Sequence, residues 1–320
     1  MSPNTVRAKA FDLRFWVEFL ALLGIGIEDA TPDHVDQFAA WLRRPVLLGR
    51  LRDVDSLEPK REPVSVNRML SSVESFYVFL DRRGVPGAHR LAAYVPHRAR
   101  SGGFLEGIVS VPGKQRQTRL KEPQKLKKTL TDAQVQVILD ACEHLRDRFL
   151  MAVMFETGCR IGQALGLRHE DFDSLKPALT IKPRRDNVNR ARGKSRTEKQ
   201  VPVRQTLIDL YTDYLFGDYG DLESDYVFVN LWGGEVGSAM TYWAAMSLVK
   251  RLRKRTGVDF HPHMFRHTHG TALLRAGVRL EIASELLTHS SARTTAENYV
   301  HLDADDIADE LYSTGFWEAP

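Results

Sequence analysis

Cysteine is scarce in this chain, with only Cys142 and Cys159 among 320 residues. Two cysteines cannot build the disulfide framework of a small secreted domain, so we expect a reducing compartment and two buried, unpaired thiols. Long apolar runs are also missing, and none approaches the roughly 18 residues that a membrane-spanning helix needs. The first residues, MSPNTVRAKAFDLRFW, contain no apolar leader core. These absences predict a soluble cytoplasmic protein with no membrane partner.

The excess of positive charge is small, +4 in total, but it is unevenly distributed. Acidic residues crowd the C-terminal tail, so the rest of the chain is more basic than the total implies; they are Asp303, Asp305, Asp306, Asp309 and Glu310. A basic body favours a polyanionic partner such as DNA. A merely solvated basic surface would have the same composition.

Helical periodicity dominates the first ninety-odd residues. Apolar positions recur at helical spacing from Thr5 to Leu23, and Gly24 ends the run. Thr31 and Pro32 have the residue types of an N-cap and a first helical position, and they open a second helix that ends near Arg43. A third helix is expected from Ser65 to Arg83. We therefore predict a small all-helical domain over residues 1–95.

Glycine and proline interrupt the next stretch, residues 96–128, which we interpret as a linker. It carries nine lysines and arginines against two glutamates. Such a segment could lie along a DNA backbone, where each neutralised phosphate releases counterions. A solvated linker of the same composition is an equally good interpretation.

A second domain is predicted over residues 129–320. Thr131 is placed to cap a helix, and the buried helical pattern RFLMAVMFETG leads to Arg160. The strand-like segments ALTIKP and EKQVPV flank a charged turn that contains Lys194, and YVFVN is a further short strand pattern. The expected fold class is mainly α, with a small antiparallel sheet in this second domain.

Several residues in the second domain could act together on a phosphodiester. Attack on phosphorus needs a positioned nucleophile, donors for the non-bridging oxygens and a proton for the leaving 5′-oxygen. Two arginines offer planar forks of donors, a lysine on a turn can supply the proton, and a histidine can accept the proton of a phenol. The candidate set is Arg160, Lys194, His263, Arg266, His289 and Tyr299.

Four segments that carry these residues resemble, in order, the motifs of the tyrosine recombinase (phage integrase) family: TGCRIGQALGL, GKSRTEKQVPV, HPHMFRHTHGTALL and LLTHSSARTTAENYVH. The first domain looks like the helical, SAM-like core-binding module of that family. The resemblance implies a clamp on the scissile phosphate by Arg160 and Arg266, with His289 as a further ligand. It also implies that Lys194 is the general acid, His263 the general base and Tyr299 the nucleophile.

The resemblance also implies partners and a reaction scheme. The family closes its two domains around double-stranded DNA, with a dimer on each site and a tetramer in synapsis, and some members use an accessory directionality factor. Strands are exchanged through a 3′-phosphotyrosine and a Holliday junction, without a cofactor or a metal. Integration, excision, resolution and transposition share the catalytic set, so the biological role and the target sequence stay open.

Two positions depart from the family pattern. Gln163 stands where a carboxylate usually braces the first arginine, and Thr288 replaces the glycine before the histidine of the last motif. An amide can accept a hydrogen bond from a guanidinium but brings no charge. Gln163 therefore leaves one alternative, a DNA-binding protein with weakened catalysis. A second alternative is a relaxing enzyme of the topoisomerase IB type, which shares the nucleophile and the set of cations.

Other interpretations concern single residues. His261, His263, His267 and His269 could suggest a metal site, but no acidic residue lies between Asp259 and Glu281 to complete it. We expect His267, His269 and His301 to be structural, and Tyr211, Tyr214, Tyr242 and Tyr312 to be ordinary core or surface tyrosines. The amphipathic tail, with Ile307, Leu311 and Tyr312 on one helical side, is expected to dock on a neighbouring protomer, although a helix packed in cis is the alternative.

Overall fold

The computed structural model describes residues 3–44, 61–92, 119–122, 128–193 and 197–287. The chain divides into two compact units, residues 1–125 and 126–320. Among the helices in the described ranges, none combines the length and apolarity needed to cross a membrane. Most of the predicted linker and the whole tail after Leu287 lie outside these ranges, so tail docking stays an expectation.

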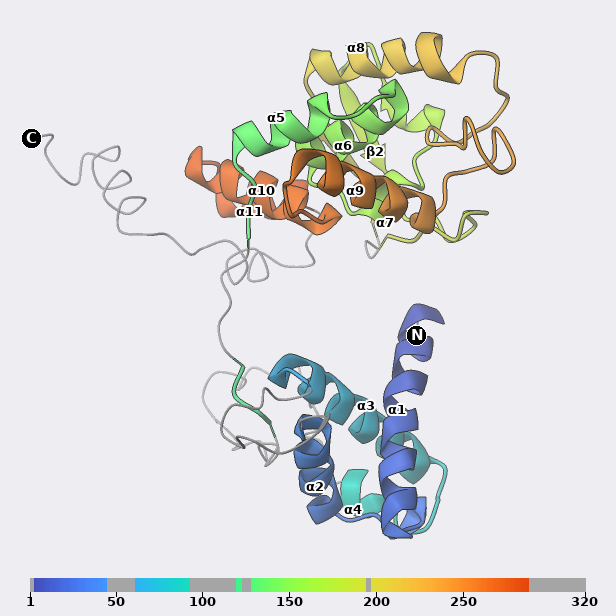
Figure 1. Ribbon diagram of the computed structural model, residues 1–320, viewed down its shortest axis with the longest axis vertical. Helices are drawn as coiled ribbons and strands as arrows, with labels where there is room; N and C mark the ends of the chain where they lie inside the picture. The colour runs from blue at the N-terminus through green and yellow to red at the C-terminus, as the bar shows by residue number, and fades with distance from the viewer. Residues whose placement is uncertain (1–2, 45–60, 93–118, 123–127, 194–196, 288–320) are drawn as a thin grey trace, which may run out of the picture. The chain divides into compact units, whose positions relative to one another are not determined.

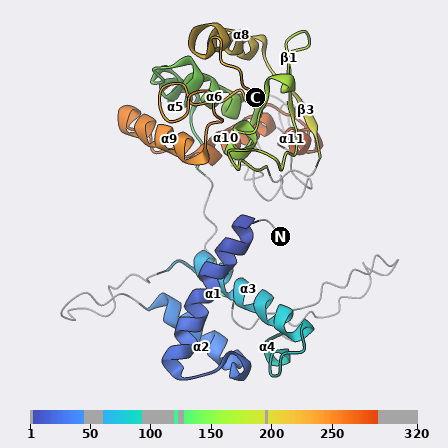
Figure 2. The ribbon, with the colours of Figure 1, turned by 90° about the vertical axis from the view of Figure 1, so that its right-hand side faces the viewer.

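The described part of the first unit is all helical, as predicted. Its elements are α1 (Pro3–Leu23), η1 (Ile27–Asp29), α2 (Pro32–Arg43), α3 (Pro63–Arg82) and the short α4 (His89–Ala92) (Figure 2). Trp16 of α1 is fully buried, and its indole N–H donates to the Tyr77 hydroxyl of α3 at 3.2 Å. The Tyr77 hydroxyl in turn donates to the carbonyl of Ile27 at 2.8 Å. This chain of bonds ties α1 and α3 to the turn that precedes α2.

A short piece of the predicted linker docks on this helical unit. The buried Asn67 side chain accepts from the Leu120 N–H at 3.0 Å and donates to the Leu120 carbonyl at 2.9 Å. The same amide nitrogen lies 2.6 Å from Glu122 Oε1, and Leu120 packs against the apolar core. Residues 119–122 therefore belong to the first unit, which the composition of the segment did not indicate.

Replacing Asn67 with alanine should release this docked segment, because its backbone loses both bonds to the amide. We expect trypsin to cleave after Arg119 and Lys121 several-fold faster than in the wild type, while the helices stay protected. Ser75→Ala on the exposed side of the same helix is the matched control. Equal protection in both variants would show that the Leu120 side chain alone holds the segment.

The second unit is built around α6 (Leu145–Thr157). Helices α5 (Asp132–Asp140), α8 (Gln205–Tyr214) and α10 (Pro262–Arg275) surround it (Figure 1). The chain also forms α7 (Ile161–Ala164), η2 (His169–Asp171), η3 (Leu215–Tyr219), α9 (Tyr242–Thr256) and α11 (Leu280–Leu286). The strands β1 (Phe172–Asp173), β2 (Ala178–Ile181) and β3 (Lys199–Pro202) make one antiparallel sheet in the order β1-β2-β3.

Helix α6 is central because apolar residues occupy nearly all of its sides. Phe149, Leu150, Met151, Val153 and Met154 are each 0 % exposed. A helix that is apolar all round must be covered by other elements. It ends at Gly158, whose φ of +59° is the left-handed conformation that terminates helices and favours glycine. The neighbouring α5 begins as predicted, with the Thr131 hydroxyl accepting from the Gln134 N–H at 3.2 Å.

The prediction of a strand at YVFVN was wrong. In the described chain, Tyr226 and Val229 each make only an isolated bridge, to Arg168 and Ala239 respectively. Val227, Phe228 and Val229 are buried in succession, so the segment fills the core without forming a ladder.

The two cysteines were predicted to be buried and unpaired. Both are unpaired, and Cys159 is buried, whereas Cys142 is half-buried.

Candidate active site

Three of the six predicted site residues lie in the described chain. Arg160 occupies the N-cap position of α7, while His263 and Arg266 stand one turn apart at the start of α10. Pro262 is the first residue of α10, and its ring favours helix initiation there. The other three residues, Lys194, His289 and Tyr299, fall outside the described ranges.

The buried guanidinium of Arg266 joins segments that are distant in sequence. Only 1 % of Arg266 is exposed. Its Nη1 donates to the Gly158 carbonyl at 2.9 Å, and its Nη2 donates to the carbonyl of Leu287. Gly158 lies two residues before Arg160, and Leu287 lies two residues before His289. One side chain, itself a predicted phosphate ligand, thus joins the segments that lead to the other two, Arg160 and His289.

Gln163 braces Arg160 in an unexpected way. Its side-chain oxygen accepts from the backbone N–H of Arg160 at 2.9 Å. Its amide nitrogen is buried and has no hydrogen-bond partner in the described part of the chain. The amide therefore fixes the backbone at the start of α7, a task for which a neutral acceptor suffices.

Two of the three histidines of α10, His263 and His267, differ in exposure. His263 is exposed, while His267 is buried as a structural residue would be, and their rings meet edge to face at 4.4 Å. An exposed imidazole beside a buried arginine can exchange a proton with a bound molecule. Within the described residues, no three His, Cys, Asp or Glu side chains are grouped as metal ligands would be.

The turn between β2 and β3 packs closely on α7. A Cβ added to Gly162 would lie 2.4 Å from the Arg192 carbonyl oxygen, and one added to Gly193 would lie 2.9 Å from Cγ of Gln163. Gly162 needs glycine because the two backbones nearly touch, and a side chain at Gly193 would displace the side chain of Gln163. Lys194 is the residue that follows Gly193, so the chain that leads to it runs beside the first turn after Arg160.

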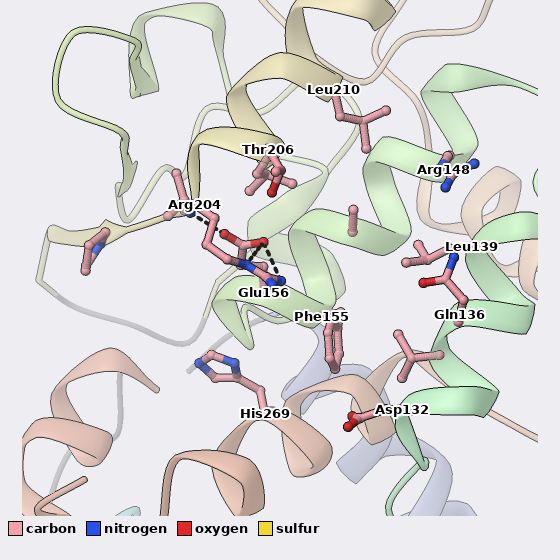
Figure 3. Close-up of a pocket in the computed structure, with 15 residues that line it drawn as sticks. Asp132, Gln136, Leu139, Arg148, Phe155, Glu156, Arg204, Thr206, Leu210 and His269 are labelled. Atoms are coloured by element: carbon pink, nitrogen blue, oxygen red, sulfur yellow. Dashed lines mark hydrogen bonds and ion pairs between the residues drawn. The ribbon is translucent and has the colours of Figure 1, made fainter. Parts of the chain in front are cut away.

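A groove of about 900 Å³ opens between α5, α6 and α8 (Figure 3). At its polar end the Glu156 carboxylate pairs with the Arg204 guanidinium at 3.0 Å, and His269 stands next to this pair. The His269 ring packs against Gly158. Burial, followed by the charges of Arg266 and Arg204, lowers the pKa of His269 to about 4. The ring therefore stays neutral at physiological pH, as a structural histidine would.

The lowered pKa of His269 predicts a pH dependence of stability. The unfolded chain protonates His269 below about pH 6.5, whereas the folded chain protonates it only near pH 4. The contribution of the neutral ring to stability is therefore complete above about pH 6.5 and is lost as the pH falls toward 4. Between pH 7 and pH 5 the free energy of unfolding should fall by on the order of 1–2 kcal/mol less in His269→Phe than in the wild type. Thermal melting at several pH values measures it, with the exposed His261→Gln as control. Parallel pH profiles for wild type and His269→Phe would contradict this.

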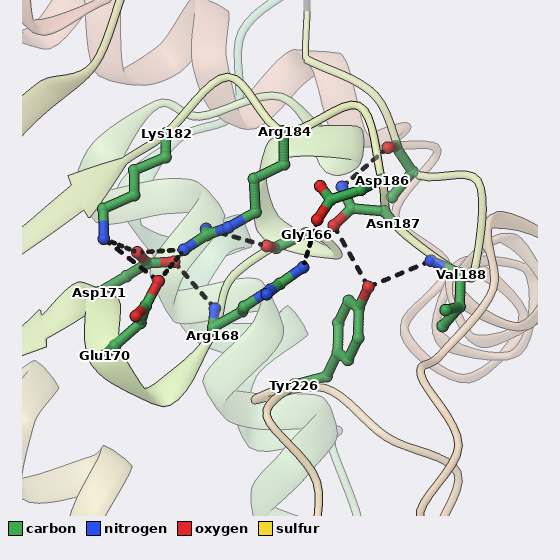
Figure 4. A network of polar contacts seen from close by, with 11 residues as sticks. Gly166, Arg168, Glu170, Asp171, Lys182, Arg184, Asp186, Asn187, Val188 and Tyr226 are labelled. Atoms are coloured by element: carbon green, nitrogen blue, oxygen red, sulfur yellow. Dashed lines mark hydrogen bonds and ion pairs between the residues drawn. The ribbon is translucent and has the colours of Figure 1, made fainter.

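Sequence reasoning missed a cluster of ion pairs at the sheet edge (Figure 4). The fully buried Asp171 carboxylate receives two bonds from Arg184, at 2.5 and 2.8 Å, and lies 3.3 Å from Lys182. Arg184 also pairs with Glu170, and hydrogen bonds from Arg184 and then Lys182 lower the pKa of Glu170. The charged segment after ALTIKP was predicted only to be a turn, because the local sequence does not show which cationic side chains pair with a buried carboxylate.

The model of the phage integrase family matches residues 128–306, more than half of the chain, and the model of its N-terminal SAM-like domain matches residues 1–84. The chain belongs to the phage integrase family. It is a tyrosine-type site-specific recombinase, an enzyme that cleaves and rejoins DNA strands through a phosphotyrosine. The predicted family and fold class are thereby confirmed.

Curated relatives match nearly the whole of this recombinase. Transposase A from transposon Tn554 of Staphylococcus aureus is 35 % identical over 97 % of this chain and 86 % of its own length. The tyrosine recombinase XerD of Corynebacterium glutamicum is 30 % identical over 96 % of this chain and 90 % of its own length.

Solved recombinase structures share the fold. The Tn1549 transposon integrase bound to transposon right-end DNA aligns over 98 % of this chain and 95 % of its own, with 17 % identity and a TM-score of 0.67. A lambda integrase dimer bound to a core site aligns over 93 % of this chain and 72 % of its own, with 13 % identity and a TM-score of 0.63.

Proposed function

We propose that Tyr299 is the nucleophile of this recombinase and that the other predicted residues surround the phosphate it attacks. The phenol oxygen forms a bond to phosphorus, and the bond from phosphorus to the 5′-oxygen breaks. His263 takes the phenol proton and Lys194 protonates the leaving oxygen, while Arg160, Arg266 and His289 offset the charge on the non-bridging oxygens. Rejoining reverses these steps, so the bond energy is kept in the tyrosine ester.

The buried guanidinium of Arg266 carries this assignment. It donates hydrogen bonds to the carbonyls of Gly158 and Leu287. These bonds support the proposal that Arg160 and His289 bind the same phosphate. Two core tyrosines, Tyr211 and Tyr214, are poorly suited as nucleophiles. Burial raises the pKa of Tyr211 to about 12 and raises that of Tyr214 further, and both rings pack on Phe149 in the core, as expected for ordinary tyrosines.

The biological role that we propose is movement of a mobile DNA element. Transposase A of Tn554 matches the chain over nearly its full length, and the Tn1549 integrase, bound to a transposon end, shares its fold. In this proposal residues 1–95 are the core-binding module, 96–128 a basic linker and 129–320 the catalytic domain. Two protomers bind each site and four meet in synapsis, with an accessory factor deciding direction.

Trapping the covalent intermediate tests the proposed nucleophile. The target sequence comes from DNA crosslinked to the protein in cells, and a duplex with that sequence is nicked just 3′ of the cleavage point so that the cut fragment diffuses away. Wild type should accumulate a protein–DNA adduct whose modified peptide contains Tyr299. Tyr299→Phe should form none, whereas Tyr312→Phe should behave as wild type.

Three results, two from the trapping experiment and one from a plasmid relaxation assay, would count against the proposal. An adduct on another residue would refute the assignment of Tyr299. Stable binding without any adduct would favour an architectural DNA-binding protein. Relaxation of supercoiled plasmid without a preferred site would favour an enzyme of the topoisomerase IB type.

A further inference from the structure

The turn that leads from β2 to Lys194 is held by two asparagines. The side-chain amide of Asn187 donates to the Ala191 carbonyl at 2.9 Å. The backbone carbonyl of Asn187 accepts from the Arg190 N–H at 2.9 Å. The Asn189 side-chain oxygen accepts from the Ala191 N–H at 3.0 Å. We name Asn187 and Asn189 the asparagine clamp.

The clamp maintains a backbone that an unconstrained chain would avoid. Arg190, between the second asparagine and Ala191, has a φ of +58°, and it is the one non-glycine residue with positive φ in the described chain. An L-residue rarely adopts this left-handed region, and such conformations persist where the surroundings enforce them. Each hydrogen bond of the clamp either spans Arg190 or is made by Arg190 itself. These bonds therefore hold the turn in one backbone conformation.

Asn189 also fastens the turn to the body of the unit. Its Nδ2 donates to the Leu165 carbonyl at 2.9 Å and to the Met240 carbonyl at 2.8 Å. Leu165 is the C-cap of α7, the helix that starts at Arg160. Met240 directly precedes Thr241, the N-cap of α9. One amide thus links the turn to both neighbouring elements.

A second fastening comes from Tyr226. Its hydroxyl accepts from the Val188 N–H at 3.1 Å and lies 3.3 Å from Asn187 Oδ1 (Figure 4). The Arg168 guanidinium lies over the Tyr226 ring, 5.4 Å from its centre. Farther along the turn, the Arg192 carbonyl and Gly193 press against α7 at Gly162 and Gln163. The whole path from Asn187 to Gly193 is consequently fixed relative to Arg160.

We propose that Asn189 is a positioning residue for Lys194, the general acid. It touches no reacting atom itself. By fixing the turn to α7 and α9, it sets where the lysine five residues later can deliver its proton relative to the phosphate held by Arg160. This inference rests on the role proposed for Lys194.

A sulfur atom in place of the leaving 5′-oxygen tests the inference. In the ordinary reaction phosphorus bonds to the phenol oxygen, and O5′ departs with a proton from the lysine ammonium. With a bridging 5′-sulfur the same bond forms, and the phosphorus–sulfur bond breaks to release a thiolate. A thiol has a pKa of about 8.5, so its anion leaves without a proton donor. A variant that cleaves the oxygen substrate slowly and the sulfur substrate normally has therefore lost general acid catalysis alone.

The experiment compares both substrates, built on the nicked duplex described above. Lys194→Ala should cleave the oxygen substrate about 100-fold or more slowly and the sulfur substrate close to the wild-type rate. Asn189→Ala should lose about 10- to 100-fold on the oxygen substrate, because a displaced acid transfers its proton poorly, and at most about threefold on the sulfur substrate. Tyr226→Phe, which removes only a hydroxyl, should show the same selectivity with a smaller loss.

Asn230→Ala is the matched control, since Asn230 is another half-buried turn asparagine and its amide donates to Ser238 at 3.2 Å. It should cleave both substrates at the wild-type rate. Equal losses on both substrates in Asn189→Ala and Tyr226→Phe would overturn the positioning role. Failure of the sulfur substrate to rescue Lys194→Ala would instead show that Lys194 is not the general acid, which removes the basis of the inference and revises the proposed function.

Discussion

Replacing Arg266 with alanine is expected to slow DNA strand cleavage by at least about a thousandfold, because the phosphate would lose one of its proposed donors and two segments would lose their anchor. Loss of a single oxyanion donor costs about 100- to 1000-fold in other enzymes. In this chain the guanidinium also satisfies the carbonyls of Gly158 and Leu287 from a site that is 1 % exposed. The variant should therefore be both inactive and less stable.

Two further variants separate these effects. Arg266→Lys keeps the charge but lacks the planar fork, so it should recover part of the stability and little of the activity. Arg148→Ala removes an exposed arginine that pairs with Asp140, and such pairs contribute little to stability. It should cleave as wild type. Single-turnover cleavage of the nicked duplex, with melting curves for each variant, measures both properties, and near-normal cleavage by a folded Arg266→Ala would refute the phosphate role.

Adding one methyl group at Gly162 is expected to reduce cleavage about 100-fold with the fold intact. The new Cβ would lie 2.4 Å from the Arg192 carbonyl oxygen, so α7 and the turn before Lys194 must move apart. Displacement of a catalytic group by roughly 1 Å can cost about 100-fold in rate. The contact lies between α7, which begins after Arg160, and the turn that leads to Lys194, so the placement of both proposed catalytic groups should be affected.

Gly233→Ala provides the control for this substitution. Gly233 has no heavy atom within 4 Å of an added Cβ and no positive φ, so alanine should be accepted there without loss. DNA binding by Gly162→Ala should stay close to that of the wild type, because the substitution removes no side chain that could contact DNA. A Gly162→Ala variant that cleaves normally would show that the turn can shift without moving Lys194.

Sequence alone determined the features that depend on local rules or on ordered motifs. The helices from Pro32 and from Asp132 were predicted from the residues at their caps, because capping is a contact between near neighbours in sequence. The two longer strands were predicted from short β-branched patterns bounded by charged turns. The family resemblance came from four spaced motifs, and the family models match both parts of the chain.

Only the tertiary structure decided how distant polar groups pair. The buried Asp171 with Arg184, the Asn67 contact with Leu120, and the backbone role of Gln163 all depend on partners that no periodicity specifies. The YVFVN segment followed the strand pattern, yet its neighbours pair with it at single residues only. Local propensity fixes the elements of this chain, whereas the choice of hydrogen-bond partner depends on which groups become buried together when the elements pack.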